Sequence, residues 1–334
     1  MSLLAFIYNR SFLRLILLIF VLGNSAGCRK VGFDQIEPVV EHDLVTFQST
    51  GIPEELDRIA EPYRILILGK PNFVQEHHDF NQLLLEKYGR QGLLFFNEYP
   101  NALNWMVEDY VTGVIDYLPT GVRQLNDDWL EKIRELNAKW ESDLPLKFIF
   151  TDVNHSRNDF QNSLKEAERV LGTQKVFTSI RIMKPETDIY ASELEDLLGQ
   201  FQRDQDSYVE LWGPLWYDRF TRMIEHEIES NRYRTGGDEK IREQLMVSIV
   251  ETYLNENPGY RAFINSGMNH AQKEVHMGPE MKRLGGYLQE LYPGDLFSIA
   301  FIGISGQRKY RFEDVELVDF NILESAGRDD LTKI

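Results

Sequence analysis

Short apolar runs alternate with segments of helical periodicity along most of the chain, and this alternation limits the folds that the chain can adopt. Runs typical of buried strands cover residues 64–69, 93–96, 146–150, 176–182, 262–267 and 297–304. Helical spacing covers residues 80–88, 101–114, 126–141, 159–171 and 279–291. Strands that alternate with helices favour a parallel sheet with helices on both faces. We therefore expect an α/β fold with a mostly parallel central sheet flanked by helices.

Residues 189–256 break this alternation, because they contain no strand pattern. Helical periodicity covers residues 192–203, 207–230 and 238–255. We expect a helical insertion or cap here, within one α/β domain that spans residues 61–312. Residues 28–60 are predicted to be a tether and entry segment, and residues 313–334 a tail.

Residues 1–27 have the pattern of a signal peptide. Arg10 and Arg14 precede an apolar core at residues 15–22, which is too short to span a bilayer as a mature helix. Small residues then lead to Cys28, the only cysteine of the chain. This arrangement resembles a bacterial lipoprotein signal, in which the cysteine thiol carries lipid. We expect a lipid anchor on Cys28 and a protein of the bacterial cell envelope that faces the periplasm or the exterior.

The formal net charge of −17 limits the partners of the chain. Nucleic-acid binding depends on neutralising phosphates with Lys and Arg, so this charge argues against a nucleic-acid partner. It also argues against a protein that lies flat on anionic lipid. The expected membrane contact is therefore the lipid on Cys28, and the expected partner is a small-molecule substrate or ligand.

Polar side chains suited to acid–base chemistry follow the predicted strands directly. The carboxyl ends of parallel strands meet at one edge of a sheet, which is where such folds bind their ligands. Seven such residues are expected at this edge: Glu76, His77, His78, Glu98, Asp152, His155 and His270. The three remaining histidines, His42, His226 and His276, are expected to be surface residues.

Carboxylates beside imidazoles allow two kinds of site. A Glu can orient a His and raise its basicity, so that the His takes a proton from water or a hydroxyl. Two or three His with carboxylates can also hold a metal and leave a position open for water. The residues alone leave both alternatives open. In either case we expect the reactive groups among His270, Glu98, His77, His78 and Glu76.

Four blocks of sequence carry a resemblance to a known family. The blocks are residues 65–69 leading to 76–80, residues 94–100, residues 242–249, and residues 267–271 followed by 284–288. In these blocks the chain resembles the erythromycin-esterase-like and haem-uptake superfamily, which includes ChaN and Tiki. The resemblance implies an α/β protein that acts as a hydrolase. In it His270, or His77 or His78, would activate water on an ester or related bond, and Glu98 would orient that histidine or share its proton.

The resemblance also suggests which residues contact a substrate. Arg242, from an Arg-acidic pair in the third block, would bind a substrate anion or hold a carboxylate of the site. The other expected substrate contacts are Tyr99, Lys70, His155 and Asp152.

Lys70 departs from the family pattern. The family has Glu after the glycine of the first strand and His shortly afterwards, whereas Lys70 follows Gly69 here. A Lys reverses the local charge, disfavours a metal and changes the protons available to the site. Two alternatives to a hydrolase therefore stay open. One is a lipoprotein that binds haem or another small ligand, with His or Tyr99 on the iron, and the other is a non-catalytic relative.

Overall fold

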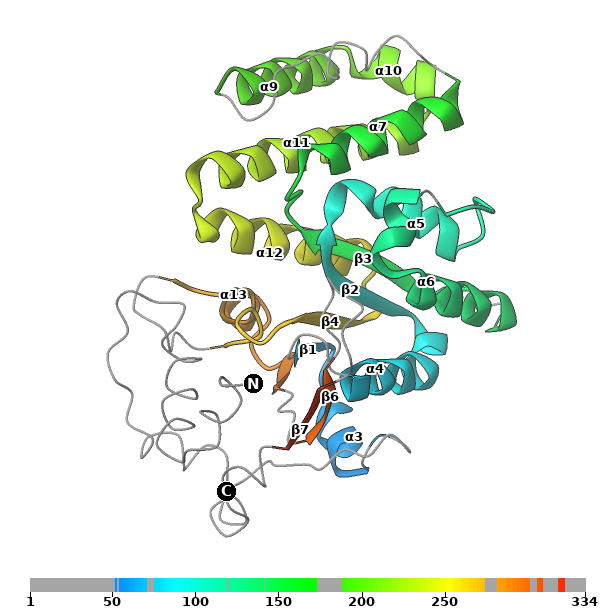
Figure 1. Ribbon diagram of the computed structural model, residues 1–334. Coiled ribbons are helices and arrows are strands. Elements are labelled where there is room, and N and C mark those ends of the chain that lie inside the picture. The colour runs from blue at the N-terminus through cyan, green and yellow to red at the C-terminus, as the bar shows by residue number, and fades with distance from the viewer. Residues whose placement is uncertain are drawn as a thin grey trace.

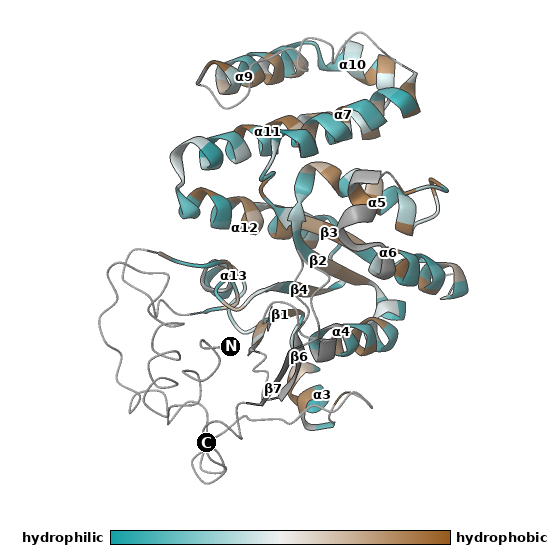
Figure 2. Cartoon of the chain, in the orientation of Figure 1, coloured by the Kyte–Doolittle hydropathy of each residue, from teal (hydrophilic) through white to brown (hydrophobic). Residues whose placement is uncertain are grey.

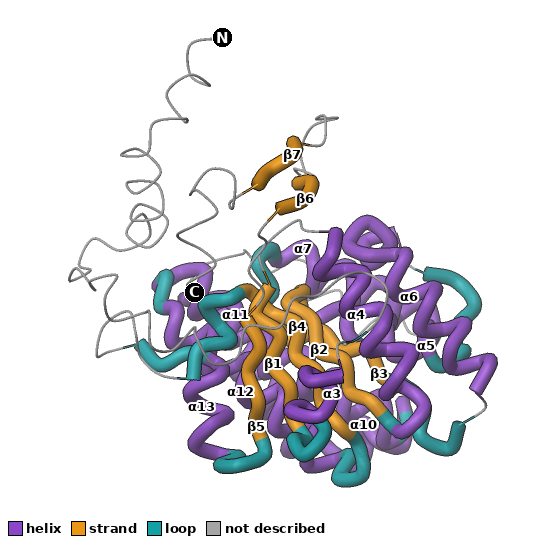
Figure 3. Tube along the Cα trace, turned by 90° about the horizontal axis from the view of Figure 1, so that it is seen from below, coloured by secondary structure: helices purple, strands orange, loops and turns teal. Residues whose placement is uncertain are grey.

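Five parallel strands form the centre of the molecule. The computed structural model describes residues 52, 54–70, 75–118, 120–140, 142–172, 188–273, 281–300, 305–308 and 318–321. The strands are β1 (Ile65–Lys70), β2 (Leu93–Pro100), β3 (Lys147–Asp152), β4 (Arg261–Gly267) and β5 (Leu296–Ala300). They lie in the spatial order β3-β2-β4-β1-β5 (Figure 3), and all four pairings are parallel. The predicted α/β fold with a parallel central sheet is confirmed.

Helices flank the sheet, and further helices stack beyond them (Figure 1). They are α3 (Glu54–Ala60), α4 (Gln75–Tyr88), α5 (Asn104–Val111), α6 (Thr120–Trp140), α7 (Arg157–Leu171), α9 (Asp188–Arg203), α10 (Gln205–Trp212), α11 (Pro214–Gly236), α12 (Glu239–Glu256) and α13 (Leu284–Leu291). A separate antiparallel pair joins β6 (Ser305–Arg308) to β7 (Val318–Asn321).

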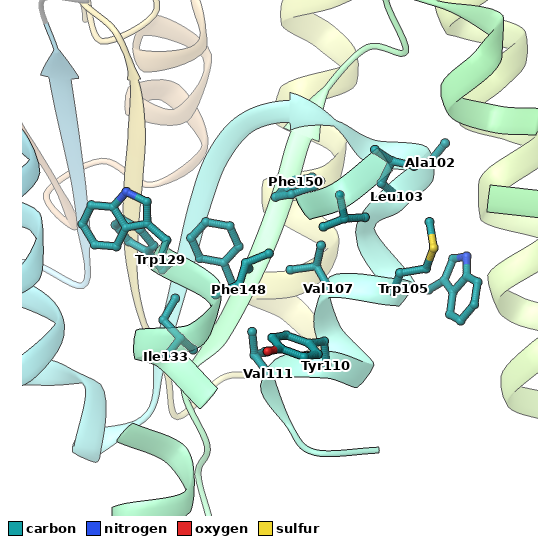
Figure 4. Packing of buried hydrophobic residues seen from close by; sticks show 14 of the residues in the cluster. Ala102, Leu103, Trp105, Val107, Tyr110, Val111, Trp129, Ile133, Phe148 and Phe150 are labelled. Atoms are coloured by element: carbon teal, nitrogen blue, oxygen red, sulfur yellow. The ribbon is translucent and has the colours of Figure 1, made fainter. Parts of the chain in front are cut away.

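The sheet separates two hydrophobic cores, because successive strand residues point to opposite faces. On one face Phe148 and Phe150 of β3 pack with Trp129 of α6 and Val107 of α5 (Figure 4). On the other face Ile149 belongs to a core that α12 and α13 cover. Burying one such side chain contributes about 1.5–3 kcal/mol. The same alternation therefore stabilises the sheet from both sides and fixes which strand residues reach its carboxyl edge.

The helical segment between α9 and α12 contains no strand anywhere in residues 188–256, as the sequence predicts. Its helices carry both polar and apolar residues along their length (Figure 2). The single helix expected over residues 207–230 is wrong, because α10 and α11 are separate. Gly213 between them has φ +81°, which favours glycine, and Pro214 then supplies a favourable first residue for α11.

Other helix boundaries also differ from those that the periodicity predicts. Helix α6 begins at Thr120 rather than residue 126, and α13 begins at Leu284 rather than residue 279. A tight 3₁₀ turn at Asn101–Leu103 precedes α5, which ends at Val111. The strand expected over residues 176–182 lies outside the described residues, and so do residues 301–304 at the end of the last expected strand. The division into domains stays a prediction.

The described part of the chain includes no helix that combines the length and the apolar character needed to cross a bilayer. The N-terminal segment, with Cys28, lies outside that part.

Candidate functional site

The carboxyl ends of β2, β3 and β4 bring Glu98, Asp152 and His270 together, as the sequence predicts. Strand β2 pairs with β3 on one side and with β4 on the other. His270 follows β4 in a tight turn. The backbone N–H of His270 donates to the carbonyl oxygen of Gly267 at 2.9 Å and closes this turn. Helix α12 packs beside β2 and β3 (Figure 1), and its first turn carries Arg242 to the same edge. Four segments that are distant in sequence thus meet at one place.

His270 is buried and lies between two carboxylates. Its Nδ1 is 2.9 Å from Oε1 of Glu243, and its Nε2 is 3.3 Å from Oε1 of Glu98. Burial alone would lower the pKa of the imidazole, but the hydrogen bonds with Glu243 and Glu98 outweigh it and raise the pKa to about 9. At neutral pH the ring is therefore an imidazolium that donates from both nitrogens.

Glu98 is held as a carboxylate by donors on both oxygens. Its Oε1 accepts from Nη2 of Arg242 at 2.7 Å, and its Oε2 accepts from the N–H of Gly267 at 2.9 Å. Burial acts to raise the pKa of Glu98. The hydrogen bond from His270, the charges of His270 and Lys70, and the backbone N–H prevail and hold the pKa well below its usual range.

Arg242 joins Glu98 to Asp152. Its Nε donates to Oδ1 of Asp152 at 2.7 Å and its Nη2 donates to Oδ2 at 2.8 Å, which is the two-bond geometry that favours Arg over Lys. His155, whose side chain is half exposed, places its Nε2 2.8 Å from Oδ2 of Asp152. Burial acts to raise the pKa of Asp152, but the bonds from His155 and Arg242 lower it, and the same bond with Asp152 raises the pKa of His155.

Glu243 and Arg283 belong to the site but are absent from the residues predicted for it. Glu243 is fully buried; its Oε1 accepts from Nη1 of Arg283 and its Oε2 from the N–H of Leu284, each at 2.8 Å. Burial acts to raise the pKa of Glu243, yet the bond from His270 and these donors lower it. The acidic neighbour of Arg242 in the third sequence block was the available signal for Glu243.

A glycine lets α13 approach His270. The N–H of Gly285 donates to the carbonyl of His270 at 2.8 Å, and a Cβ on Gly285 would lie only 2.8 Å from the carbonyl oxygens of Ala271 and Gln272. Any side chain at position 285 would therefore push α13 away from the turn. The backbone N–H of Leu284, at the start of α13, donates to Glu243. The close approach of α13 therefore also fixes the carboxylate that orients the imidazole.

Seven side chains, alternately basic and acidic, form one continuous series of contacts across the edge. In order they are Arg283, Glu243, His270, Glu98, Arg242, Asp152 and His155. We call them the strand-edge cluster. Asp152, Glu243 and His270 are buried, and Glu98, Arg242 and Arg283 are partly buried, so solvent screens the interactions at the centre of the cluster less than those at its exposed end, His155. The cluster can therefore hold a proton on His270 beside a carboxylate, or present fixed charges to a polar ligand.

The other predicted residues have different positions. Lys70 is the last residue of β1, is partly buried, and acts on Glu98 through its charge. The ring of Tyr99 packs against Phe150, with centroids 5.1 Å apart, beside the core that includes Phe150. His77 lies buried in α4, with its ring 3.3 Å from the amide nitrogen of Asn81. The side chains of Glu76 and His78, and all of Cys28, lie outside the described residues.

The donor set of the strand-edge cluster does not suit a metal or a haem iron. The guanidinium of Arg242 already occupies the space between Glu98 and Asp152, and a cation there would compete with it. Both ring nitrogens of His270 face carboxylates rather than open space. Within the described residues, no group of three or more His, Cys, Asp or Glu side chains is arranged to hold a metal ion.

Comparisons with known proteins support the fold. No family model matches the chain, and no curated protein matches it in sequence. Among solved structures, the chain is similar to an erythromycin esterase variant in its open conformation, with 15% identity and a TM-score of 0.54 over 80% of this chain and 78% of that one.

Two further solved structures share this fold. A Bacillus cereus protein has 17% identity and a TM-score of 0.57, over 87% of this chain and 80% of that one. A succinoglycan biosynthesis protein has 13% identity and a TM-score of 0.58, over 90% of this chain and 85% of that one. At these identities the likeness concerns the fold, and it agrees with the resemblance expected from the sequence blocks.

Proposed function

We propose that this chain is a hydrolase-like protein that cleaves an ester or related bond at the strand-edge cluster. The observation that carries the proposal is the position of His270 between Glu98 and Glu243 at the carboxyl edge of a parallel sheet. The likeness of the fold to an erythromycin esterase supports the same class of reaction. An acid–base pair held at this edge is the arrangement that such a reaction requires.

His270 would act first as the proton donor. The contact of its Nε2 with Glu98, at 3.3 Å, is longer than the contact of its Nδ1 with Glu243, at 2.9 Å. Nε2 is therefore the nitrogen whose proton a substrate oxygen would accept in place of Glu98. Water adds to the ester carbonyl carbon, the C–O bond to the leaving group breaks, and the leaving oxygen takes the proton from Nε2. The neutral imidazole then accepts the proton that the attacking water releases, which returns His270 to its initial state.

Ester turnover by the full-length chain in detergent tests this proposal. His270→Gln keeps much of the side-chain volume but removes the titrating group, and we expect turnover to fall by about 10²-fold or more. Glu210→Gln, a substitution of an exposed carboxylate on α10, is the matched control. Equal turnover in wild type and His270→Gln, with both proteins folded, would contradict the assignment.

A second candidate function is small-ligand binding without turnover, and Lys70 favours it. Its charge helps to keep Glu98 ionised, and a carboxylate with a lowered pKa is a weak base. The site would then bind a polar ligand through groups that are already ionised. Thermal stabilisation by a non-hydrolysed ester analogue, together with no turnover, would favour this function. A Soret band on haem titration would contradict the conclusion that the cluster does not suit a haem iron.

We further propose that lipid on Cys28 tethers the protein to a membrane of the bacterial cell envelope, facing the periplasm or the exterior. The apolar core at residues 15–22 and the single cysteine that follows it support this location. Cys28→Ala should move the protein from the membrane fraction to the soluble fraction after the signal is cleaved. Mass spectrometry of the N-terminal peptide would show whether acyl chains are present on Cys28.

A further inference from the structure

A groove of 490 Å³ lies between α9, α11 and α12, away from the residues of the strand-edge cluster. Its volume is within the range of about 300–1,000 Å³ that is usual for small-molecule sites. Apolar side chains from all three helices line it, among them Leu198, Ile228 and Leu245. Charged side chains lie beside this apolar surface, so the groove offers both kinds of contact to one ligand.

Two adjacent polar residues of α11 line the groove without partners of their own. Neither Glu225 nor His226 forms a hydrogen bond or an ion pair with any residue in the described part of the chain. His226 is partly buried, which corrects the expectation that it is a surface residue. Burial, and then the charge of Arg222, lower the pKa of His226 to about 4. The ring is therefore neutral at pH 7 and can accept a hydrogen bond.

The charges that line the groove are unbalanced. Three carboxylates, Glu195, Glu225 and Glu229, lie beside one guanidinium, that of Arg232. Arg232 is already paired with both Glu195 and Glu229. Arg222, which lies next to this surface, is paired with Asp218 and Glu256. Within the described part of the chain Glu225 has no ion pair: burial raises the pKa of its carboxyl group, and Arg222, which is paired elsewhere, acts on it by charge alone and opposes that effect.

We propose that this groove binds an organic cation, an amine carried on an apolar body. The ammonium group would donate to the carboxylate of Glu225 and to a ring nitrogen of His226, and the apolar body would cover Leu198 and Leu245. A concave surface with an excess of one charge concentrates ligands of the opposite charge. Cationic ligands are thus favoured over neutral or anionic ones of the same shape.

The groove is separate from the strand-edge cluster, although α12 contributes to both. Ile241, Gln244 and Leu245 line the groove, whereas Arg242 and Glu243 point to the cluster. At 100° per residue these two sets lie on opposite sides of the helix. Binding in the groove does not depend on the proposed hydrolase function, so the two proposals can fail independently.

Titration calorimetry on the full-length chain in detergent tests the proposal, with phenylbutylamine as the cationic probe. Phenylbutanol and phenylbutyrate are the neutral and anionic probes of the same apolar body, and detergent alone gives the blank. We expect the amine to bind more tightly than the alcohol and the alcohol more tightly than the acid. Glu225→Gln should weaken amine binding by about two- to fivefold, because Glu225 is solvent-exposed.

Two further variants complete the test. Ser248→Trp places a large ring in the groove and should abolish binding of the amine and of the alcohol. Glu210→Gln on α10 removes a carboxylate elsewhere on the surface and should leave amine affinity unchanged. Equal affinity for amine and alcohol, tightest binding of the acid, or amine binding that survives Ser248→Trp would each overturn the proposal. Concentration-dependent self-association that Ser248→Trp abolishes would also overturn it, because a second copy would then fill the groove.

Discussion

Oε1 of Glu243 lies 2.9 Å from Nδ1 of His270, and both side chains are buried. The carboxylate is itself held by Arg283 and by the N–H of Leu284. Glu243 therefore holds Nδ1 of the imidazole firmly, whereas Nε2 makes only the longer contact with Glu98. This asymmetry determines which nitrogen can take part in proton transfer, and it gives Glu243 a positioning role.

Glu243→Gln should lower the pKa of His270. The amide oxygen of Gln can still accept from Nδ1–H, but it brings no negative charge, so one of the two interactions that stabilise the imidazolium is weakened. We expect the pKa to move from about 9 toward the ordinary value of 6.5. The chemical shifts of the imidazole protons against pH would measure it. Glu256→Gln, on an exposed residue at the other end of the same helix, is the control, and an unchanged titration in Glu243→Gln would contradict the role assigned to Glu243.

Protonation of His270 should make the stability of the protein fall as pH rises. The folded state holds this proton more tightly than the unfolded state, because the pKa is about 9 rather than 6.5. The stabilisation is thus complete below pH 6.5 and is lost as pH rises through 9; it amounts to ~3 kcal/mol for a buried group. Urea midpoints measured from pH 6 to 10 would show the slope. The slope should be much reduced in His270→Gln, and an equal slope in that variant would assign the effect to other groups.

Removal of Arg242 should destabilise the fold strongly. Arg242→Met leaves the carboxylates of Glu98 and Asp152 without their shared cation, and breaking a buried pair in this way costs about 3–5 kcal/mol. Denaturant unfolding would measure the loss. Adding Asp152→Asn to Arg242→Met removes one of the uncompensated charges and should restore part of the stability. If the double variant is no more stable than the sum of the single effects predicts, the two residues are not coupled as described.

The strand-end residues could be predicted from the sequence because their position follows from local pattern. A strand that ends at a given residue places the next polar side chain at the sheet edge, and this is sufficient for Glu98, Asp152 and His270. The parallel arrangement follows from the alternation with helices. The helical character of residues 188–256 is equally local, since periodicity alone reveals it.

The partners that hold His270 could not be predicted in the same way. Glu243 lies on α12 and Arg283 directly precedes α13, and only the packing of these two helices on the sheet brings both residues to the imidazole. Tyr99 illustrates the same limit: its neighbour Glu98 faces the cluster, whereas its own ring packs against Phe150. The break at Gly213 was missed because the apolar spacing of α10 and α11 continues across it, while the backbone conformation of the glycine does not.

Gly285→Ala should lower both the stability of the protein and the pKa of His270, although Gly285 itself has no side chain in the site. The added Cβ would lie 2.8 Å from the carbonyl oxygens of Ala271 and Gln272, and backbone atoms cannot yield as a flexible side chain would. Helix α13 must then shift, which moves the N–H of Leu284 away from Glu243 and loosens the hold on His270. We expect a loss of about 1–3 kcal/mol of stability, typical of overpacking, together with a lower pKa for His270. Gly236→Ala, in α11, where a Cβ meets no atom within 4 Å, is the matched control; it should leave the pKa of His270 unchanged and raise stability by about 0.4–1 kcal/mol. A His270 titration that stays as in wild type, despite the loss of stability, would show that the approach of α13 supports the fold but does not set the charge of the imidazole.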